Sequence, residues 1–206
     1  MISKIVQITG VLLLFALSQS FSQTKEELFS QLSSRFTKAS SISFDFQSGE
    51  MKSFSGTIKA KKGNKYIIEA SSRIIKCNGK TLWNYSIQDK QVIISDFNES
   101  YLEGSSIETI FFKFLNEYEP IDLKREHSSK SNSLLLIMKK KGSSAKDNNE
   151  IHVWLEHKTH NPLKIQMINN NEISNWLISN LKTDLTLSDS QFKLSIPKEV
   201  EIIDLR

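Results

Sequence analysis

Histidine is the first residue type to consider for chemistry, because imidazole serves both as a general base and as a metal ligand. Two of the four histidines, His157 and His160, lie in the segment EHKTHNP beside Glu156. These three side chains could share a metal ion, but no further ligand is near them in the sequence. A polar turn between strands explains the segment better, and we expect no metal site.

Other signatures of catalysis are also missing from the sequence. It contains neither a G-x-S-x-G nucleophile elbow nor a glycine-rich phosphate loop. The single cysteine, Cys77, lies in a strand-like segment, where a buried and unreactive thiol is the usual case. We therefore predict a protein that is not an enzyme and that needs no cofactor.

The charge of the chain is mild, with a formal net value of +4 over 206 residues. Its densest basic segments, KAKK at 59–62 and KKK at 139–141, stand at strand ends beside turn residues. Solvated strand ends explain them better than a basic stripe, so nucleic acid is not an expected partner.

The first 22 residues have the pattern of a secretory signal peptide. Lys4 precedes the apolar run VLLLFAL, and small and polar residues follow up to a possible cleavage site between Ser22 and Gln23. No cysteine follows the run, so the lipid-attachment signal of a bacterial lipoprotein is absent. We expect residues 23–206 to be exported as one soluble domain.

Two segments have the pattern of amphipathic helices. In the first, TKEELFSQLSSRF, Thr24 and Glu27 have the spacing of a capping box, and an apolar stripe follows. In the second, around IETIFFKFLNEY, Ser105 and Glu108 have the same spacing. Its apolar stripe is wide and consists of Ile107, Ile110, Phe111, Phe114 and Leu115.

Most of the remaining chain alternates between apolar and polar residues, as Ile42, Phe44 and Phe46 do in SISFDFQ. This period of two predicts strands with one apolar face, and Asn78-Gly79 is a strong hairpin signal. About eleven strands and two main helices result. Such a sheet must close into a barrel or curl around something. The helices could plug a dry core or form a lid over a cavity, and the periodicity leaves both possibilities open.

Three segments resemble the periplasmic outer-membrane lipoprotein carrier family, LolA. They are GTIKAKKGNKYIIEA, then NGKTLWNYSIQDKQVIIS, and finally FKLSIPKEVEIID near the end of the chain. Their order and spacing match the family over roughly residues 25–206. The most specific part is GKTLW-Y, which includes Trp83.

The resemblance implies a mainly β fold, an unclosed antiparallel barrel whose helices form a lid over a hydrophobic cavity. It implies a monomeric periplasmic protein that takes lipidated lipoproteins from an inner-membrane lipoprotein-releasing ABC transporter. The carrier would deliver them to an outer-membrane lipoprotein receptor. A non-enzymatic sensor or interaction module of the same fold, binding lipidated ligands, is the alternative.

One departure from the family concerns the latch of the lid. The family has K-R-P where this chain has Lys61, Lys62 and Gly63, and the family's arginine bonds to the lid. Lys62 carries the charge without a planar fork of donors, so we expect it to form a looser latch.

We hypothesise that the apolar side chains of the strands and of the second helix bind the ligand, with a structural core as the competing interpretation. The candidates are Phe44, Phe46, Phe54, Ile58, Tyr66, Ile68 and Trp83 in the wall, and Ile107, Phe111 and Phe114 in the lid.

Overall fold

The computed structural model describes residues 23–49, 54–98, 112–127, 132–144, 149–169 and 172–206. The predicted signal peptide and two of the predicted lid residues, Ile107 and Phe111, lie outside these ranges. The described helical elements are the α-helix α1 (Lys25–Lys38) and the 3-10 helices η3 (Phe114–Glu117) and η4 (Asp189–Phe192).

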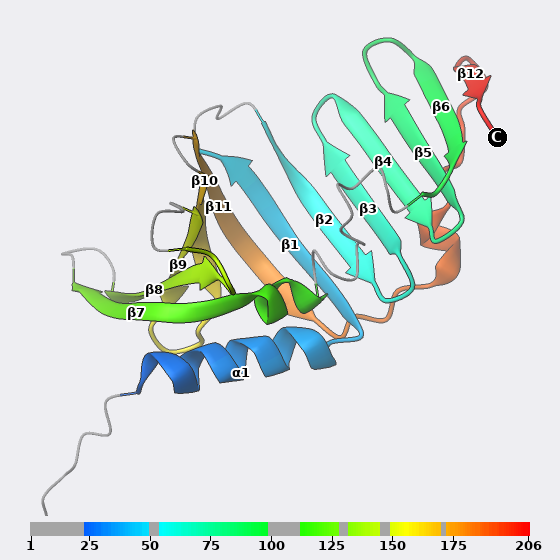
Figure 1. The fold of residues 1–206 in the computed structure, drawn as a ribbon. Helices are drawn as coiled ribbons and strands as arrows, with labels where there is room; N and C mark the ends of the chain where they lie inside the picture. The colour runs from blue at the N-terminus through cyan, green and yellow to red at the C-terminus, as the bar shows by residue number, and fades with distance from the viewer. Residues whose placement is uncertain (1–22, 50–53, 99–111, 128–131, 145–148, 170–171) are drawn as a thin grey trace, which may run out of the picture.

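The described strands form one twelve-stranded sheet in the order β12-β6-β5-β4-β3-β2-β1-β11-β10-β9-β8-β7 (Figure 1). Neighbouring strands are antiparallel, apart from the parallel pair of β12 and β6. The edge strands β7 and β12 do not pair with each other, so the barrel is unclosed, as predicted. The strands are β1 (Ser41–Ser48), β2 (Ser55–Lys61), β3 (Lys65–Ala70), β4 (Arg73–Asn78), β5 (Thr81–Ser86), β6 (Gln91–Asp96), β7 (Tyr118–His127), β8 (Asn132–Lys140), β9 (Asn149–Glu156), β10 (Pro162–Asn169), β11 (Glu172–Thr183) and β12 (Glu201–Asp204).

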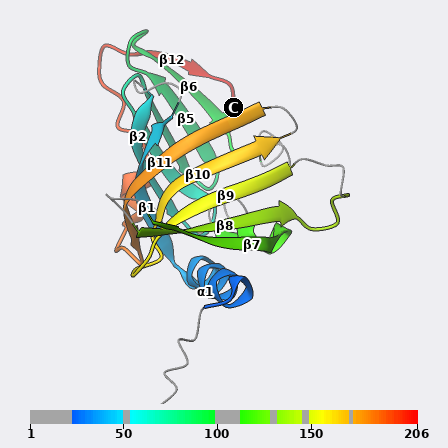
Figure 2. The same ribbon diagram turned by 90° about the vertical axis from the view of Figure 1, so that its left-hand side faces the viewer.

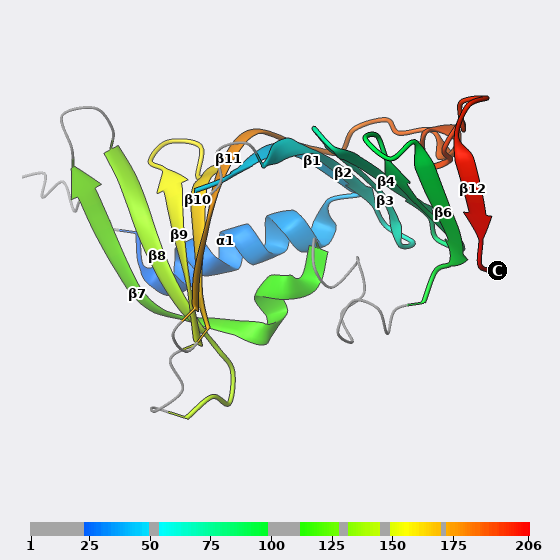
Figure 3. The same cartoon turned by 90° about the horizontal axis from the view of Figure 1, so that it is seen from above.

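The sheet is strongly curved and has a concave and a convex side. Seen from above it forms an arch, with α1 and the green segment before β7 on the concave side (Figure 3). In the side view, helix α1 lies below β7 at the bottom of the molecule (Figure 2). The segment after β11 follows the convex side towards β12 (Figure 3).

Helix α1 begins as the sequence predicts. The hydroxyl of Thr24 accepts a hydrogen bond from the backbone N–H of Glu27, and the Glu27 carboxylate accepts one from the N–H of Thr24. This reciprocal capping box satisfies two backbone donors that the first turn leaves free. Leu28 and Leu32 are the buried residues of the helix and pack against the concave face. Among the residues that the structure describes, no helix combines the length and apolar character needed to cross a bilayer.

The twelfth strand, β4, is the one that the alternation did not predict, although its Cys77 was expected to lie in a strand. Its sequence RIIKCN places Ile74 and Ile75 side by side, which obscures the alternation between the two faces. The predicted hairpin at Asn78-Gly79 joins it to β5. Gly79 has a φ of 90°, and the side-chain oxygen of Asn78 accepts hydrogen bonds from the N–H groups of Lys80 and Thr81.

The second predicted helix is only partly described, because residues 99–111 lie outside the described ranges. Its described end comprises Phe112 and Lys113 in a π-helical conformation and η3 at Phe114–Glu117. We call residues 112–117 the lid segment. It leads directly into β7 and lies on the concave side of the sheet.

A β-bulge joins the two halves of the sheet where β1 pairs with β11. The register shifts between Ser43 and Asp45, opposite Asn180, whose φ is 53°. Asparagine tolerates this left-handed conformation better than most residues. The Asp45 carboxylate accepts hydrogen bonds from the Asn180 amide (2.6 Å) and from the Thr57 hydroxyl (2.7 Å). Asp45 therefore ties the bulge to β2 across the convex face.

We expect Asp45→Ala to lower the free energy of unfolding by about 1 kcal/mol at pH 7, because a charged acceptor of two hydrogen bonds is lost. These two hydrogen bonds lower the pKa of Asp45 in the folded protein. The stabilisation is therefore complete above the unfolded pKa of about 4 and disappears as the pH falls through the folded pKa. Urea unfolding of both proteins at pH 7 and at about pH 2.5 measures this difference.

Glu69→Ala is the matched control, since Glu69 pairs with Thr57 on the same face and is exposed. It should cost less than Asp45→Ala. A loss for Asp45→Ala that is equally large at both pH values would contradict the role of the ionised carboxylate.

Candidate functional site

An apolar cavity of about 590 Å³ lies between the concave face of the sheet, α1 and the lid segment. Side chains from both halves of the sheet and from both covering segments contribute to it. The lining residues are Leu32, Phe36, Ile42, Phe44, Phe46, Phe54, Ile58, Ile68, Phe114, Leu115, Glu117, Tyr118, Met138, Ile151, Val153, Leu155, Pro162, Ile165, Met167, Trp176, Ile178 and Leu181.

The first wall of the cavity follows from the alternation in β1 to β3. Phe44 pairs with Ile58, and Ile58 pairs with Ile68 on the next strand. Directly paired residues share a face of the sheet, so these three line the cavity in a row. Asp45 and Thr57, one position further along, are on the convex face. The wall is thus the direct result of the period-two pattern.

The second wall consists of β8 to β11 and is completed by the bulge. Ile165 pairs with both Val153 and Trp176, so these residues form a second apolar row. On β11 the lining residues are Trp176, Ile178 and Leu181. Ile178 and Leu181 are three positions apart, whereas a regular strand would place residues of one face two positions apart. The extra residue at the bulge turns Leu181 back to the concave side.

The cavity is closed at one end and open at the other. Its closed end lies beside α1, where Leu32, Ile42 and Leu155 are almost completely buried. Its mouth contains Phe54, with 40% of its surface exposed, and Met167, with 44%. Such exposure of large apolar residues next to a cavity is typical of a binding site rather than of a sealed core.

Three aromatic rings meet near the mouth. The ring centroids of Phe46 and Phe54 are 5.7 Å apart, and Trp176 lies 5.9 Å from Phe46 and 6.0 Å from Phe54. Tilted and edge-to-face rings at these distances attract one another. The cluster connects β1, the start of β2 and β11, and so it joins the two walls.

Glu117 is the one charged side chain among the described lining residues. It lies at the end of η3, with its carboxylate 3.8 Å from the Nζ atom of Lys140. Burial, together with the Glu117 charge, raises the pKa of the neighbouring Tyr118 hydroxyl. The other side chains of the cavity offer almost no hydrogen bonds, so the cavity suits a hydrocarbon ligand.

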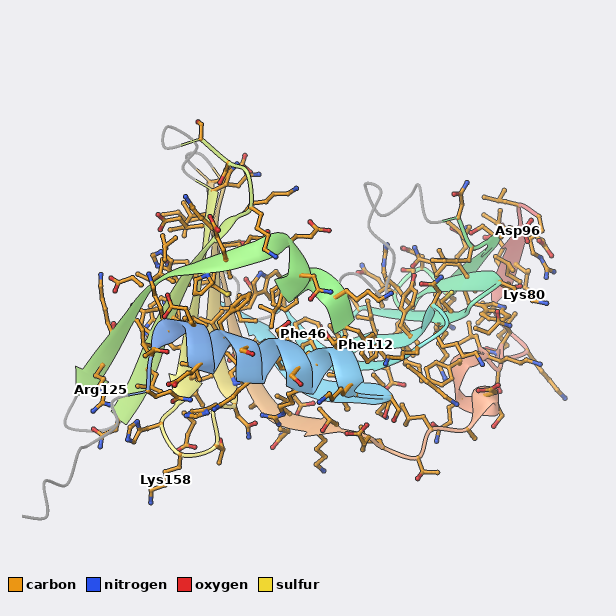
Figure 4. The ribbon with its side chains drawn as sticks, turned by 60° about the horizontal axis from the view of Figure 1, so that its bottom comes forward. Phe46, Lys80, Asp96, Phe112, Arg125 and Lys158 are labelled. Atoms are coloured by element: carbon orange, nitrogen blue, oxygen red, sulfur yellow. The ribbon has the colours of Figure 1, made fainter. Side chains whose placement is uncertain are left out.

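Six of the ten predicted binding residues line this cavity: Phe44, Phe46, Phe54, Ile58, Ile68 and Phe114. Ile107 and Phe111 lie outside the described residues. Figure 4 shows Phe46 and Phe112 in the middle of the molecule beside α1, whereas Lys80, Asp96, Arg125 and Lys158 lie towards its periphery.

Tyr66 faces the concave side but does not line the cavity. It is 4% exposed and belongs to a cluster with Ala60, Cys77 and Phe112. Burial raises the pKa of its hydroxyl group well above the ordinary value, as expected for a phenol without access to water. The ring of Phe97 lies 6.5 Å away. Tyr66 is thus part of a packed core next to the cavity.

Trp83 does not line the cavity either, because it lies on the convex face. Trp83 pairs with Lys76, and Lys76 pairs with Ile67, so these three residues share one face of the sheet. The next residue, Ile68, lines the cavity on the other face. The segment with η4 covers this part of the convex face, and the Lys76 ammonium group donates a hydrogen bond to the carbonyl of Gln191 there. Lys76 of β4 therefore links the sheet to its outer covering next to Trp83.

The sequence analysis missed two residues of special importance. Phe112 is 1% exposed and fills the concave side next to the cavity. In a helical pattern it falls outside the apolar stripe that contains Phe114, so periodicity did not select it. Trp176 belongs to the aromatic cluster at the mouth. The alternation within β11, with Ile178 two positions later, could have indicated it.

Lys62 contacts both segments that cover the cavity. Its Nζ atom donates a hydrogen bond to the carbonyl of Thr37 in the last turn of α1 (2.9 Å) and lies 6.0 Å from the centre of the Phe112 ring. A cation is favoured at the C-terminus of a helix and over the face of an aromatic ring. The predicted latch residue is therefore positioned between α1 and the lid segment.

The residues considered for metal binding or catalysis lie in a turn or in the buried core. His157 and His160 lie in and beside the turn between β9 and β10. Within the described ranges, no group of three acidic, histidine or cysteine side chains could hold a metal ion. Cys77 is fully buried, and burial raises the pKa of its thiol to about 11. A buried thiol of this kind is a poor nucleophile at neutral pH.

Several solved structures are similar to this chain at low sequence identity. An uncharacterized conserved protein from Thermus thermophilus is 12% identical, with a TM-score of 0.52 over 85% of this chain and 98% of its own. LprF from Mycobacterium bovis is 9% identical, with a TM-score of 0.49 and coverages of 85% and 97%. For a LolA superfamily protein from Nitrosomonas europaea the values are 13%, 0.38, 84% and 99%.

A search of curated protein sequences found no match. The sequence does match the family described as outer membrane lipoprotein carrier protein LolA, over residues 30–195. The matched region extends from α1 to just beyond η4, and so it includes every strand except β12. The chain belongs to the LolA family of outer membrane lipoprotein carrier proteins.

Proposed function

We propose that this protein is a non-enzymatic carrier that shelters the acyl chains of lipoproteins while they cross the periplasm. The observation that carries the proposal is the apolar cavity, with one charged residue among its described lining and a mouth of exposed apolar side chains. Membership of the LolA family supports the same role. An apolar cavity with an open end suits a ligand whose hydrocarbon part is buried and whose polar part stays outside.

The physical need for such a carrier is large. Exposing an acyl chain to water costs about 0.8 kcal/mol per CH₂ group. Two or three chains therefore represent a cost of tens of kcal/mol, and a lipoprotein cannot cross an aqueous compartment unaided. A cavity that removes these chains from water offsets the cost without any chemical step.

Release of the cargo is as important as its capture. The lid segment and α1 cover the cavity when it holds no ligand, and they bury their own apolar side chains there. Loading exchanges these contacts for contacts with acyl chains, so the two states can be close in free energy. We propose that the donor is an inner-membrane lipoprotein-releasing ABC transporter and that the acceptor is an outer-membrane lipoprotein receptor.

A release assay tests the proposal directly. The protein is produced by export from a bacterial host, purified, and added to spheroplasts that make a lipidated reporter and contain the releasing transporter. A Cys→Ser reporter that cannot be lipidated is the control. We expect the lipidated reporter alone to appear in the soluble fraction in a stable complex. If a folded carrier releases none, the proposal fails, and the sensor or interaction module becomes the function to test.

We expect Met167→Glu to reduce release about tenfold, because it places a charge at the mouth of the cavity, where acyl chains must pass. Leu177→Glu is the matched control. Leu177 is similarly exposed, 47% against 44%, but it lies between Trp176 and Ile178 and faces the convex side. The two variants should be equally stable to urea. Equal release by both would show that the cargo does not use this mouth.

We expect Lys62→Met to loosen the cover of the concave side, because the hydrogen bond to Thr37 and the contact with Phe112 are lost. Cys77, the single cysteine of the chain, belongs to the same buried cluster as Phe112 and reports such opening. Losing about 1 kcal/mol of closure should speed its alkylation roughly fivefold.

Lys61→Met is the control for Lys62→Met, since the Lys61 ammonium group contacts Leu187 and Asp189 in the segment that covers the convex face. It should leave the alkylation rate of Cys77 unchanged. Equal rates for the two variants would remove Lys62 from the role of latch.

A further inference from the structure

We infer that Glu117 makes the cavity prefer a lipid that carries a free ammonium group beside two acyl chains. This is the chemistry of a lipoprotein whose N-terminal cysteine bears two chains and an unmodified amine. The inference rests on the proposed function and adds to it a class of cargo. Cargo whose amine carries a third chain, as an amide, lacks the positive charge and gains nothing from the carboxylate.

Glu117 lies at the same end of the sheet as the mouth of the cavity. Met138 on β8 pairs with Ile151, and Ile151 pairs with the mouth residue Met167. On β7, Pro120 pairs with Met138 and continues this row across the strands. Glu117 immediately precedes β7 and therefore lies beyond the row, at the rim. A ligand whose chains fill the cavity has its polar end near this carboxylate.

The backbone fixes Glu117 at the rim. The N–H of Lys141 donates a 2.8 Å hydrogen bond to the carbonyl of Glu117, and the Lys141 ammonium group donates a 2.9 Å hydrogen bond to the carbonyl of Asn116. Neither bond uses the Glu117 carboxylate, whose side chain contributes to the cavity lining. The charge of Glu117 is therefore held beside the mouth.

The ion pair that Glu117 forms with Lys140 is weak. The carboxylate lies 3.8 Å from the Nζ atom, and the two side chains are 46% and 59% exposed. Exposed pairs of this kind contribute little to stability. Acyl chains that fill the cavity displace water from beside the carboxylate, and a carboxylate that loses water needs a positive charge close to it. An ammonium group on the ligand supplies that charge where the chains end.

Dipalmitoyl lipopeptides that share one uncharged peptide sequence and differ at the N-terminus provide the test. One has a free amine, one has a dimethylated amine, which keeps the charge, and one has an acetylated amine, which loses it. We expect the wild type to bind the two charged forms about fivefold more tightly than the acetylated form. Competition with a fluorescent lipopeptide measures these affinities. High salt should reduce the preference, because a half-exposed ion pair is screened.

Glu117→Gln should abolish the preference by weakening the binding of the charged forms, and it should change the affinity for the acetylated form less than twofold. Glu119→Gln is the matched control and should keep the preference. Glu119 is also 46% exposed at its side chain and pairs with Lys139 at 3.5 Å, but it does not line the cavity. Lys140→Met removes the competing ammonium group and should increase the preference about twofold.

Two further ligands define the class of cargo. A tripalmitoyl lipopeptide, whose amine is an amide, should bind equally well to the wild type and to Glu117→Gln. Dipalmitoyl phosphatidylethanolamine has two chains and an ammonium group, but the carboxylate repels its phosphate. We expect it to bind the wild type more weakly than the free-amine lipopeptide. Binding that is equal or tighter would assign the ammonium group to a membrane lipid and overturn the assignment to lipoproteins.

Equal affinity of the wild type for the free and acetylated forms would overturn the role of Glu117. A preference that persists in Glu117→Gln would do the same. Either result would leave the carrier intact. Failure of the wild type to bind any of the lipopeptides would instead refute the proposed function, and the preference with it.

Discussion

The pairing of β1 with β11 is the interaction on which the cavity depends. It joins strands β2 to β6 and β12 to strands β7 to β10, which are otherwise separate runs of hairpins. The bulge at this junction sets which side chains of β11 face inwards. A one-residue change of register would turn an apolar row to the convex side. The hydrogen bonds from Thr57 and Asn180 to Asp45 therefore help to shape the cavity, although these residues lie on the opposite face.

The same junction explains why the centre of the molecule is not filled by its own side chains. One buried cluster lies where α1 packs on β8 and β9, and it contains Leu28, Leu32 and Leu136. A second lies over β1 to β4 around Phe112. Each cluster is anchored on its own half of the arch, and the curvature keeps the halves apart. The apolar space between them is the cavity, and its stability when empty depends on the segments that cover it rather than on close packing.

Much of this arrangement could be predicted from the sequence, because it follows from local rules. The capping box of α1, the hairpin at Asn78-Gly79 and the apolar row that begins at Phe44 all depend on residues close together in the chain. The face of Trp83 could not be predicted in this way. The alternation predicts that Trp83 and Tyr85 share a face of the sheet. Whether that face is the concave or the convex one depends on the register through β3 and β4. That register is a property of the whole sheet, and β4 itself was obscured by its adjacent isoleucines.

Phe112 shows a different limit of sequence-based reasoning. A helical periodicity assigns each residue to an apolar or a polar face, but the described part of the lid segment is not a regular α-helix. The π-helical start and the 3-10 turn direct Phe112 into the buried cluster over β1 to β4 and Phe114 into the cavity. Both apolar side chains are therefore removed from water. Lys62 then contacts α1 and the Phe112 ring at once, as a point charge on a flexible stem. Such a contact needs no fixed orientation. It suits the carrier proposed above, which works without a chemical energy source, because a latch that holds firmly would oppose every loading step.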